Sequence, residues 1–423
     1  MTLPPGRVIP LRIAPVEAPT LASVRPLPPA DSPSLEPYRV LFPLGAACGI
    51  AGALAWFAQA LGWIPWPTLL HAGFMVEGFE LAFVTGFLLT AMPAFTHGAR
   101  CRPWELAGTA GGVTLFAFAR LAGPEPLAHA LFAATLAFAA VAVARRVRLG
   151  AAAPPEEFAL VGAGMLMGVA GGVMQALAAA GMYAEPSPRL GLRLVSRGMV
   201  LALVLGLGGL LVPTFAMIRE PLRIMGVAPA GQRRGRREFI AAVALLIAGA
   251  LGAEAAGHPQ LAAWMRLAAG AASTLLAWKL WRLPQQGARL PWALWSAGAS
   301  VLLGLAAAAV LPAHEIAAWH IVFIGGYGLL TMSIGTRVVV SHGGHDFRDE
   351  GRVLGLSSII ALALAALVRA GAGEADPRLA PWLATAGVFW TIAWGLWLVA
   401  ALPRVIRTKR ALMMPAAPGR RPA

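Results

Sequence analysis

Long apolar stretches alternate with short polar segments along almost the whole chain, from about residue 39 to residue 402. Twelve of these stretches are long enough to cross a bilayer, because a spanning helix needs about 20 mostly apolar residues. The pattern predicts an all-α polytopic membrane protein with about twelve transmembrane helices. The predicted spans are 39–61, 69–96, 105–121, 126–144, 157–181, 190–217, 238–256, 259–278, 291–311, 314–336, 353–373 and 379–402.

The composition agrees with this class of protein. Hydrophobic residues make up 58% of the chain and charged residues 13%, whereas soluble domains have about 25% charged residues. Residues 1–38 are rich in proline and lack the apolar core of a signal peptide, so we expect a disordered cytoplasmic tail there. The predicted organisation is this tail, a transmembrane domain over 39–402 and a basic cytoplasmic tail over 403–423.

Basic residues predict the orientation of the spans, since lysine and arginine favour the cytoplasmic side. With the N-terminus in the cytoplasm, 27 of the 34 lysine and arginine residues fall on cytoplasmic segments, and the C-terminus is cytoplasmic too. The net charge of +15 then indicates anchoring at lipid headgroups, and we expect no nucleic-acid partner. The seven exceptions are Arg120, Arg189, Arg193, Arg197, Arg266, Arg369 and Arg378.

A similar sequence recurs near the ends of three spans and suggests an internal repeat. Pro93 and Pro213 are 120 residues apart, and Leu88 and Leu329 are 241 apart, close to twice that spacing. This predicts three pseudo-repeats of four helices, although small residues and leucine also recur by chance in apolar helices. If the repeat is real, the second, sixth and tenth spans occupy equivalent places near the centre.

Two histidines lie toward the predicted outer ends of the second and tenth spans. His71 follows Pro67 by four residues and His320 follows Pro312 by eight, which places them about 6 Å and about 12 Å from the predicted outer ends. Two imidazoles on equivalent helices could bind one haem iron. The alternative is that each histidine bonds to a carbonyl or to water at a helix end.

Two acidic residues lie deeper in the second span. Glu77 and Glu80 are three residues apart, so an α-helix would place them on one face. Two hypotheses stay open: a proton path from an outer site, and structural pairing with an arginine.

Arg193 and Arg197 form one basic patch at the start of the sixth span, because they are i and i+4 neighbours. Facing inward, they could bind anionic groups such as haem propionates; facing lipid, they would extend to the interface.

At the cytoplasmic ends of the second and tenth spans, His97, His342 and His345 are typical of interfacial residues, and a second metal site is the alternative there.

Several segments resemble the signatures of the NnrS family, which comprises haem- and copper-containing bacterial inner-membrane proteins linked to nitric oxide stress. The resemblance extends over all twelve spans. The matching segments are His71-Ala72-Gly73-Phe74-Met75 with Gly86-Phe87-Leu88-Leu89-Thr90-Ala91, Pro213-Thr214-Phe215, and His320 with Gly328-Leu329-Leu330-Thr331, Thr336-Arg337 and His342-Gly343.

The resemblance implies a multi-pass protein of the bacterial inner membrane that binds haem and copper through His71, His320 and His342. The chain departs from the family's His-Ala-His-Glu motif, because Gly73 and Phe74 replace its second histidine and its glutamate. This departure affects the expected copper site more than the haem site.

The sequence therefore favours an NnrS-like haem protein, with or without copper, in the response to nitrosative stress or in membrane redox chemistry. Whether it is an enzyme stays open. One alternative is a secondary transporter that uses Glu77 and Glu80, and another is a non-catalytic membrane assembly or sensor protein. Apart from the lipid bilayer, the partner we consider is a redox partner or a second membrane subunit.

Overall fold

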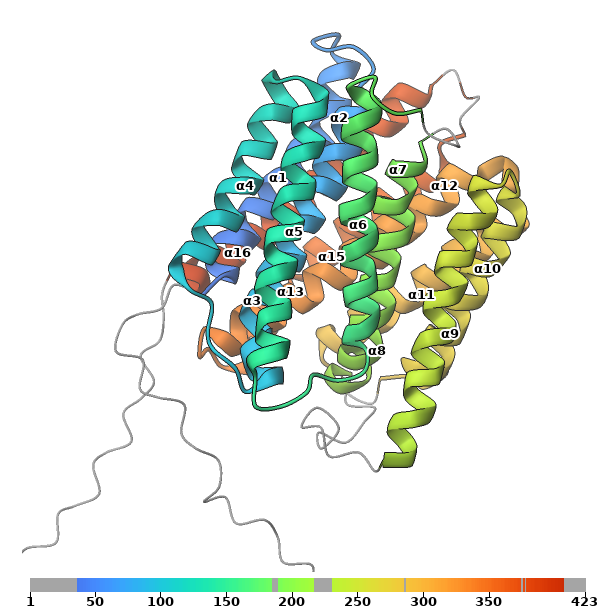
Figure 1. Ribbon diagram of the computed structural model, residues 1–423. Helices are drawn as coiled ribbons and strands as arrows, with labels where there is room; N and C mark the ends of the chain where they lie inside the picture. Colours follow the sequence, from blue (N-terminus) through green and yellow to red (C-terminus); the bar gives the residue numbers. More distant parts are fainter. Residues whose placement is uncertain are drawn as a thin grey trace, which may run out of the picture. The chain divides into compact units, whose positions relative to one another are not determined.

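The computed structural model describes residues 36–184, 189–216, 230–284, 287–373, 376 and 378–406. Most of the two predicted tails lies outside these residues. All regular structure in the described part of the chain is helical, and no strand occurs there (Figure 1). The prediction of an all-α protein is confirmed.

The helices follow the predicted spans. Three of them are composite: α2 (Thr68–Ala72), η2 (Gly73–Glu80) and α3 (Leu81–Thr96); α7 (Leu190–Arg193), η3 (Leu194–Met199) and α8 (Val200–Phe215); and α12 (Glu315–His320), η7 (Ile321–Gly328) and α13 (Leu329–His342). The other long helices are α1 (Tyr38–Ala60), α4 (Pro103–Ala122), α5 (Glu125–Leu149), α6 (Phe158–Ala179), α9 (Ala230–Ala255), α10 (Pro259–Ala271) with η5 (Ala272–Ala277), α11 (Arg289–Val310), α15 (Leu356–Gly371) and α16 (Leu379–Ile406). Short helices η6 (Pro312–His314), η8 (Phe347–Asp349) and α14 (Glu350–Val353) lie between them.

Among the described residues, nine helical segments are long and apolar enough to cross a membrane. A tenth is obtained if the pair 347–353 and 356–371, which is bent by 46°, counts as one span. The predicted spans at 105–121 and 259–278 are helical as well but do not meet the same standard of length and hydropathy. The protein is thus a polytopic membrane protein, and the count of twelve is not confirmed.

The three composite helices share one irregularity. In each, a short α-helix passes into a π-helical segment and then returns to an α-helix. The π segments η2, η3 and η7 follow directly after the first turns of the second, sixth and tenth predicted spans. π segments are rare and frequently mark functional sites, so their recurrence at equivalent places supports the predicted repeat.

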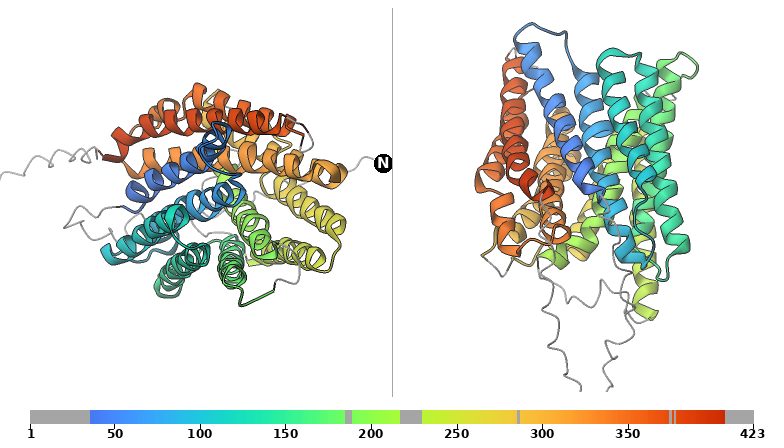
Figure 2. Two further views of the ribbon diagram at one scale, coloured as in Figure 1. Left: turned by 90° about the horizontal axis from the view of Figure 1, so that it is seen from above. Right: turned by 90° about the vertical axis from the view of Figure 1, so that its left-hand side faces the viewer.

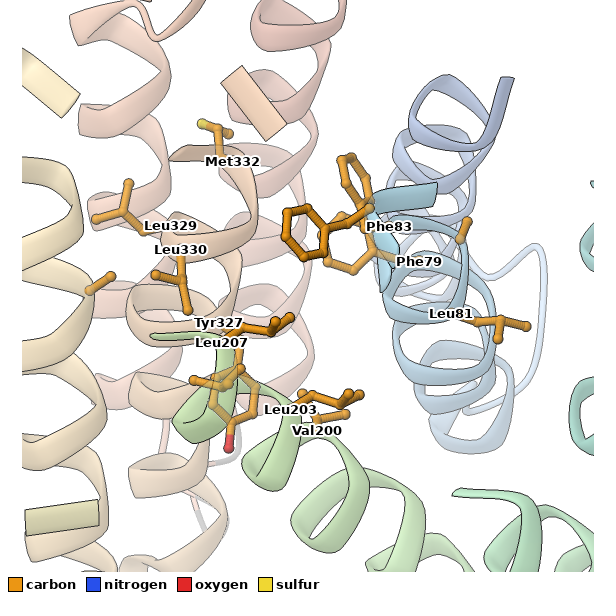
Figure 3. Packing of buried hydrophobic residues seen from close by; sticks show 14 of the residues in the cluster. Phe79, Leu81, Phe83, Val200, Leu203, Leu207, Tyr327, Leu329, Leu330 and Met332 are labelled. Atoms are coloured by element: carbon orange, nitrogen blue, oxygen red, sulfur yellow. The ribbon is translucent and has the colours of Figure 1, made fainter. Parts of the chain in front are cut away.

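These three helices are also the most deeply buried. In their most apolar windows, 78%, 89% and 67% of the residues are buried, against 33–56% for the other six candidate spans. Figure 3 shows apolar side chains of these helices, among them Phe79, Phe83, Leu203, Leu207 and Tyr327, which belong to one cluster of buried residues. The expectation that they lie near the centre is met.

The first and last helices pack against each other, as both views of Figure 2 show. A Cβ built on Gly387 of α16 would stand 2.5 Å from the Ala53 carbonyl oxygen of α1, so only glycine permits this approach. The indole of Trp390 donates a hydrogen bond to the Gly49 carbonyl oxygen at 3.1 Å. Such contacts close the bundle around the three composite helices.

Candidate functional site

His71 and His320 face each other at the ends of α2 and α12, just before the π segments η2 and η7. Their ring centres are 6.5 Å apart and their planes differ by 16°. His71 Nδ1 lies 3.0 Å from the Gly52 carbonyl oxygen, and His320 Nδ1 lies 2.7 Å from that of Ile316. Because a carbonyl oxygen only accepts, each Nδ1 must bear the proton, which leaves each Nε2 with a free lone pair.

The surroundings of this histidine pair are mostly apolar and aromatic. The Trp56 ring centre lies 5.6 Å from that of His71, and the Phe323 ring centre lies 5.8 Å from that of His320. Arg369 of α15 is buried and lies within electrostatic range of both imidazoles. The pair is therefore a nitrogen-donor site with one cation nearby.

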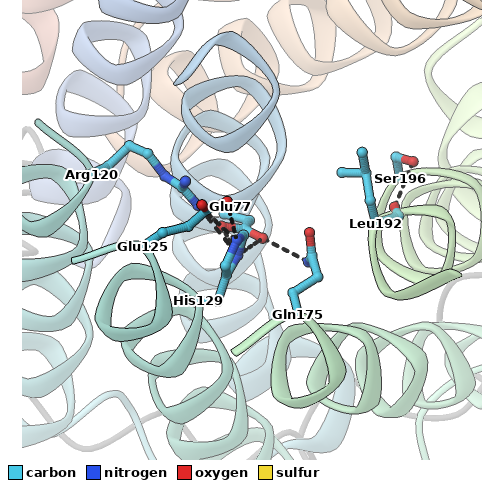
Figure 4. Close-up of polar contacts among 7 residues, drawn as sticks. All are labelled: Glu77, Arg120, Glu125, His129, Gln175, Leu192 and Ser196. Carbon is cyan, nitrogen blue, oxygen red and sulfur yellow. Dashed lines mark hydrogen bonds and ion pairs between the residues drawn. The ribbon is translucent and has the colours of Figure 1, made fainter. Parts of the chain in front are cut away.

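Glu77 is the centre of a second polar group, which four helices build (Figure 4). Arg120 Nη2 donates to Glu77 Oε2 at 3.0 Å, His129 Nδ1 donates to Oε1 at 2.8 Å and Gln175 Nε2 donates to Oε1 at 2.9 Å. The Glu77 side chain is only 1% exposed. This carboxylate is fully paired. Of the two hypotheses drawn from the sequence, the structure supports pairing with an arginine.

Gly73 is what allows Arg120 to reach Glu77. A Cβ built on Gly73 would stand 2.7 Å from Arg120 Nε and 3.0 Å from its Cζ. This is the position at which the family motif has its second histidine. Arg120 therefore occupies the space in which a side chain at this position would lie. Its guanidinium has no lone pair with which to bind a metal ion.

Glu80 differs from Glu77 despite its closeness in sequence. It is 7% exposed, and no hydrogen bond or ion pair with another described residue involves it. The expectation that Glu77 and Glu80 lie on one helix face is wrong, because residues 73–80 form a π-helix. With about 4.4 residues per turn rather than 3.6, residues three apart are separated by about 115° rather than about 60°.

Arg193 and Arg197, the predicted propionate partners, belong to an ion cluster. Arg197 Nη1 donates to Glu254 Oε1 at 2.9 Å and to Glu315 Oε1 at 2.6 Å, while Arg193 Nε lies 3.4 Å from Glu254 Oε1. Arg266 also pairs with Glu254. The patch thus faces protein, and two carboxylates already neutralise much of its charge.

His342 lies far from the histidine pair, at the other end of the same helix. It follows His320 by 22 residues, which is roughly 30 Å along the axis. His342 Nδ1 lies 3.2 Å from Glu36 Oε2. Among the residues that the structure describes, no group of three or more His, Cys, Asp or Glu side chains is arranged to hold a metal ion.

Sequence analysis assigned no role to several residues of these polar groups. Arg120, Arg266 and Arg369 were noticed only as exceptions to the distribution of positive charge, and His129 and Glu254 had no predicted partner. A signal was available, since five of the seven exceptions have buried or partly buried side chains in the described helices. A basic residue inside a span on the wrong side of the membrane predicts a buried acid on another helix.

Comparison with known proteins supports the resemblance seen in the sequence. A search of curated proteins finds no match. The family model described as NnrS protein matches residues 34–409, which is most of the chain and includes every helix described above. The chain belongs to the NnrS family.

Proposed function

We propose that this protein binds one haem between His71 and His320 and takes part in membrane redox chemistry in the response to nitric oxide. The observation that supports the proposal is the geometry of the histidine pair. Two imidazoles that bind one metal ion through nitrogen at about 2 Å each have ring centres roughly 6 Å apart. The observed separation is 6.5 Å.

The donor set favours haem over a bare metal ion. A free Zn²⁺ or Cu²⁺ ion needs about four ligands, and the described residues near the pair add none. Haem iron already has four porphyrin nitrogens and takes its remaining ligands from side chains such as histidine. Two imidazoles are therefore enough.

The chain's own residues would prepare this site. The Gly52 and Ile316 carbonyl oxygens fix the tautomer and orientation of the two rings, as hydrogen bonds to metal-binding histidines generally do. Trp56 and Phe323 place aromatic rings beside the two imidazoles, and Arg369 places a positive charge where an anionic group would be stabilised. When bound, haem would supply the capacity to accept and donate one electron.

Copper, which the family also implies, would need donors other than this pair. Gly73 and Phe74 offer none, and Arg120 covers Gly73. His342 would have to act at the opposite end of the helix. Measuring copper beside iron decides whether this member of the family binds it.

The same proposal includes location and partners. We place the protein in the bacterial inner membrane with both termini in the cytoplasm, because 27 of 34 basic residues then lie on the cytoplasmic side. The histidine pair would lie in the outer half of the bilayer. An electron donor, as a redox partner or a second membrane subunit, completes the chemistry.

A reduced-minus-oxidised visible spectrum of the purified protein, with elemental analysis for iron and copper, tests the proposal. We expect a haem signal with stoichiometric iron, and its loss in His71→Ala and His320→Ala. His258→Ala is the matched control, because His258 is exposed at the start of α10. Unchanged haem in both variants, or a blank spectrum in folded protein from haem-replete cells, would reject the proposal in favour of a transporter or an assembly protein.

A further inference from the structure

Glu80 is an acidic side chain near the centre of the bundle that the haem site does not use. It is 7% exposed, and within the described part of the chain no hydrogen bond or ion pair is made to its carboxyl group. An isolated carboxylate is strongly disfavoured in apolar surroundings. A group in this position is stabilised when it binds a proton.

Tyr327 is the polar neighbour of Glu80 on the tenth predicted span. It is 1% exposed, and its hydroxyl has no hydrogen-bond partner among the described residues. The carboxyl group of Glu80 lies within electrostatic range of this hydroxyl. Figure 3 shows the Tyr327 ring among the apolar side chains of the three central helices. The unpartnered Tyr327 hydroxyl thus lies within electrostatic range of the buried carboxyl group of Glu80.

Both residues lie on the helices that bear the histidine pair. Glu80 ends η2, nine residues after His71, and Tyr327 lies in η7, seven residues after His320. At a rise of 1.5 Å or less per residue, these offsets are at most about 13 Å and about 10 Å along the axis. Glu80 and Tyr327 therefore lie at a similar depth, directly inward of the histidine pair.

The other charged or titratable groups on elements packed against η2 have partners elsewhere. Arg120 of α4 and His129 of α5 bind Glu77, and Arg197 of η3 binds Glu254 and Glu315. On α1, Cys48 packs against Gly78. None of these contacts gives Glu80 a counter-ion.

We propose that Glu80 is a proton-binding residue coupled to the haem site. Resting on the function proposed above, its carboxylate would take up one proton from water when a haem held by His71 and His320 is reduced by an external one-electron donor. The proton leaves a hydronium ion and adds to a carboxylate oxygen, so one O–H bond breaks and one forms; Tyr327 is the polar side chain within electrostatic range of that carboxyl. On reoxidation of the haem by one electron, Glu80 would return the proton to water.

The physical cause is charge compensation. Reduction removes one positive charge from the haem site, and Glu80 then loses an attraction that favours its ionised form. At about 12 Å and an effective dielectric constant of about 20, this attraction changes proton affinity roughly tenfold.

The first test is the midpoint potential of the bound haem at several pH values. We expect the potential of the wild-type protein to fall as pH rises, by up to about 59 mV per pH unit for one proton per electron. Glu80→Gln should flatten this dependence. Glu125→Gln is the matched control, because Glu125 is 43% exposed, and it should keep the wild-type slope.

Infrared difference spectra give a second readout that reports on the carboxyl group itself. Reduction of the wild-type protein should produce the C=O band of a protonated carboxylic acid, which shifts in D₂O. Glu80→Gln should lack this band, and Tyr327→Phe should keep it at a shifted frequency.

The outcomes separate this inference from the haem proposal. A wild-type protein that binds haem but shows neither the band nor the pH dependence overturns the coupling and leaves the haem site standing. The same holds if Glu80→Gln keeps both signals. A protein that binds no haem overturns both proposals.

Discussion

His71 and His129 are two histidines of one bundle with opposite surroundings. His71 has one ring nitrogen fixed by a backbone carbonyl and the other left with its lone pair. Both ring nitrogens of His129 are engaged by charged side chains, with Nδ1 at 2.8 Å from Glu77 and Nε2 at 3.3 Å from Arg120. The second ring nitrogen separates the proposed ligand from the structural histidine, because it keeps its lone pair in His71 and is engaged in His129.

The same contrast separates their neighbours. Around His129, every strong charge has an opposite charge, so the group is closed and its removal should affect folding. Around His71, the contacts are aromatic or uncharged, and Nε2 keeps its lone pair. Removal of His71 should therefore affect haem binding. The following predictions test this division, from the largest expected effect to the smallest.

Arg120→Ala should have the largest effect on stability. It leaves the buried Glu77 carboxylate without its cation, and breaking a buried pair in this way costs about 3–5 kcal/mol. We expect a much lower yield of folded protein and a lower midpoint of thermal unfolding in detergent. An unfolding midpoint equal to that of the wild-type protein would contradict the closed ion cluster.

His129→Ala should lower stability by about 1–3 kcal/mol while the folded protein keeps its haem, because Glu77 retains Arg120 and Gln175. His71→Ala should do the reverse and remove the haem with little change in the unfolding of the haem-free protein. Haem content and unfolding midpoints of both variants, measured side by side, check the comparison. If both variants lose haem equally, the division between the two regions is wrong.

Gly73→Ala should destabilise by about 1 kcal/mol, since the new methyl group meets the guanidinium that Glu77 and His129 hold in place. Gly111→Ala, on α4 with open space around it, is the matched control and should be neutral or stabilising. Thermal unfolding of the pair measures the difference. Equal midpoints would mean that Arg120 moves aside freely.

Glu125→Gln should have the smallest effect, within about 0.5 kcal/mol. Glu125 is 43% exposed and lies 3.6 Å from His129 Nε2, so it is at the edge of the cluster. Its unfolding midpoint and haem content should match those of the wild-type protein.

The helices and the histidine pair could be predicted from the sequence because both depend on position along the chain. Apolar length places the spans, and offsets from Pro67 and Pro312 give the depths of His71 and His320. The repeat adds that their helices are central. All three inferences use order and spacing, which a single sequence contains.

The ion pairs could not be predicted because they depend on rotation and on contacts between distant segments. Arg197 and Glu254 are 57 residues apart, and Arg197 and Glu315 are 118 apart. The π segments add a second difficulty, since they turn Glu80 away from the face that α-helical spacing assigns to it. No periodicity in the sequence marks where the helix changes its pitch.

The closed cluster around Glu77 also has a consequence for biosynthesis. All three partners of this carboxylate come later in the chain, on α4, α5 and α6, so none exists when the second helix leaves the ribosome. A lone charged residue at the centre of a helix disfavours membrane insertion by about 2.5–3.5 kcal/mol. The second helix therefore depends on three later helices, α4, α5 and α6, for the partners that stabilise its buried carboxylate in the bilayer.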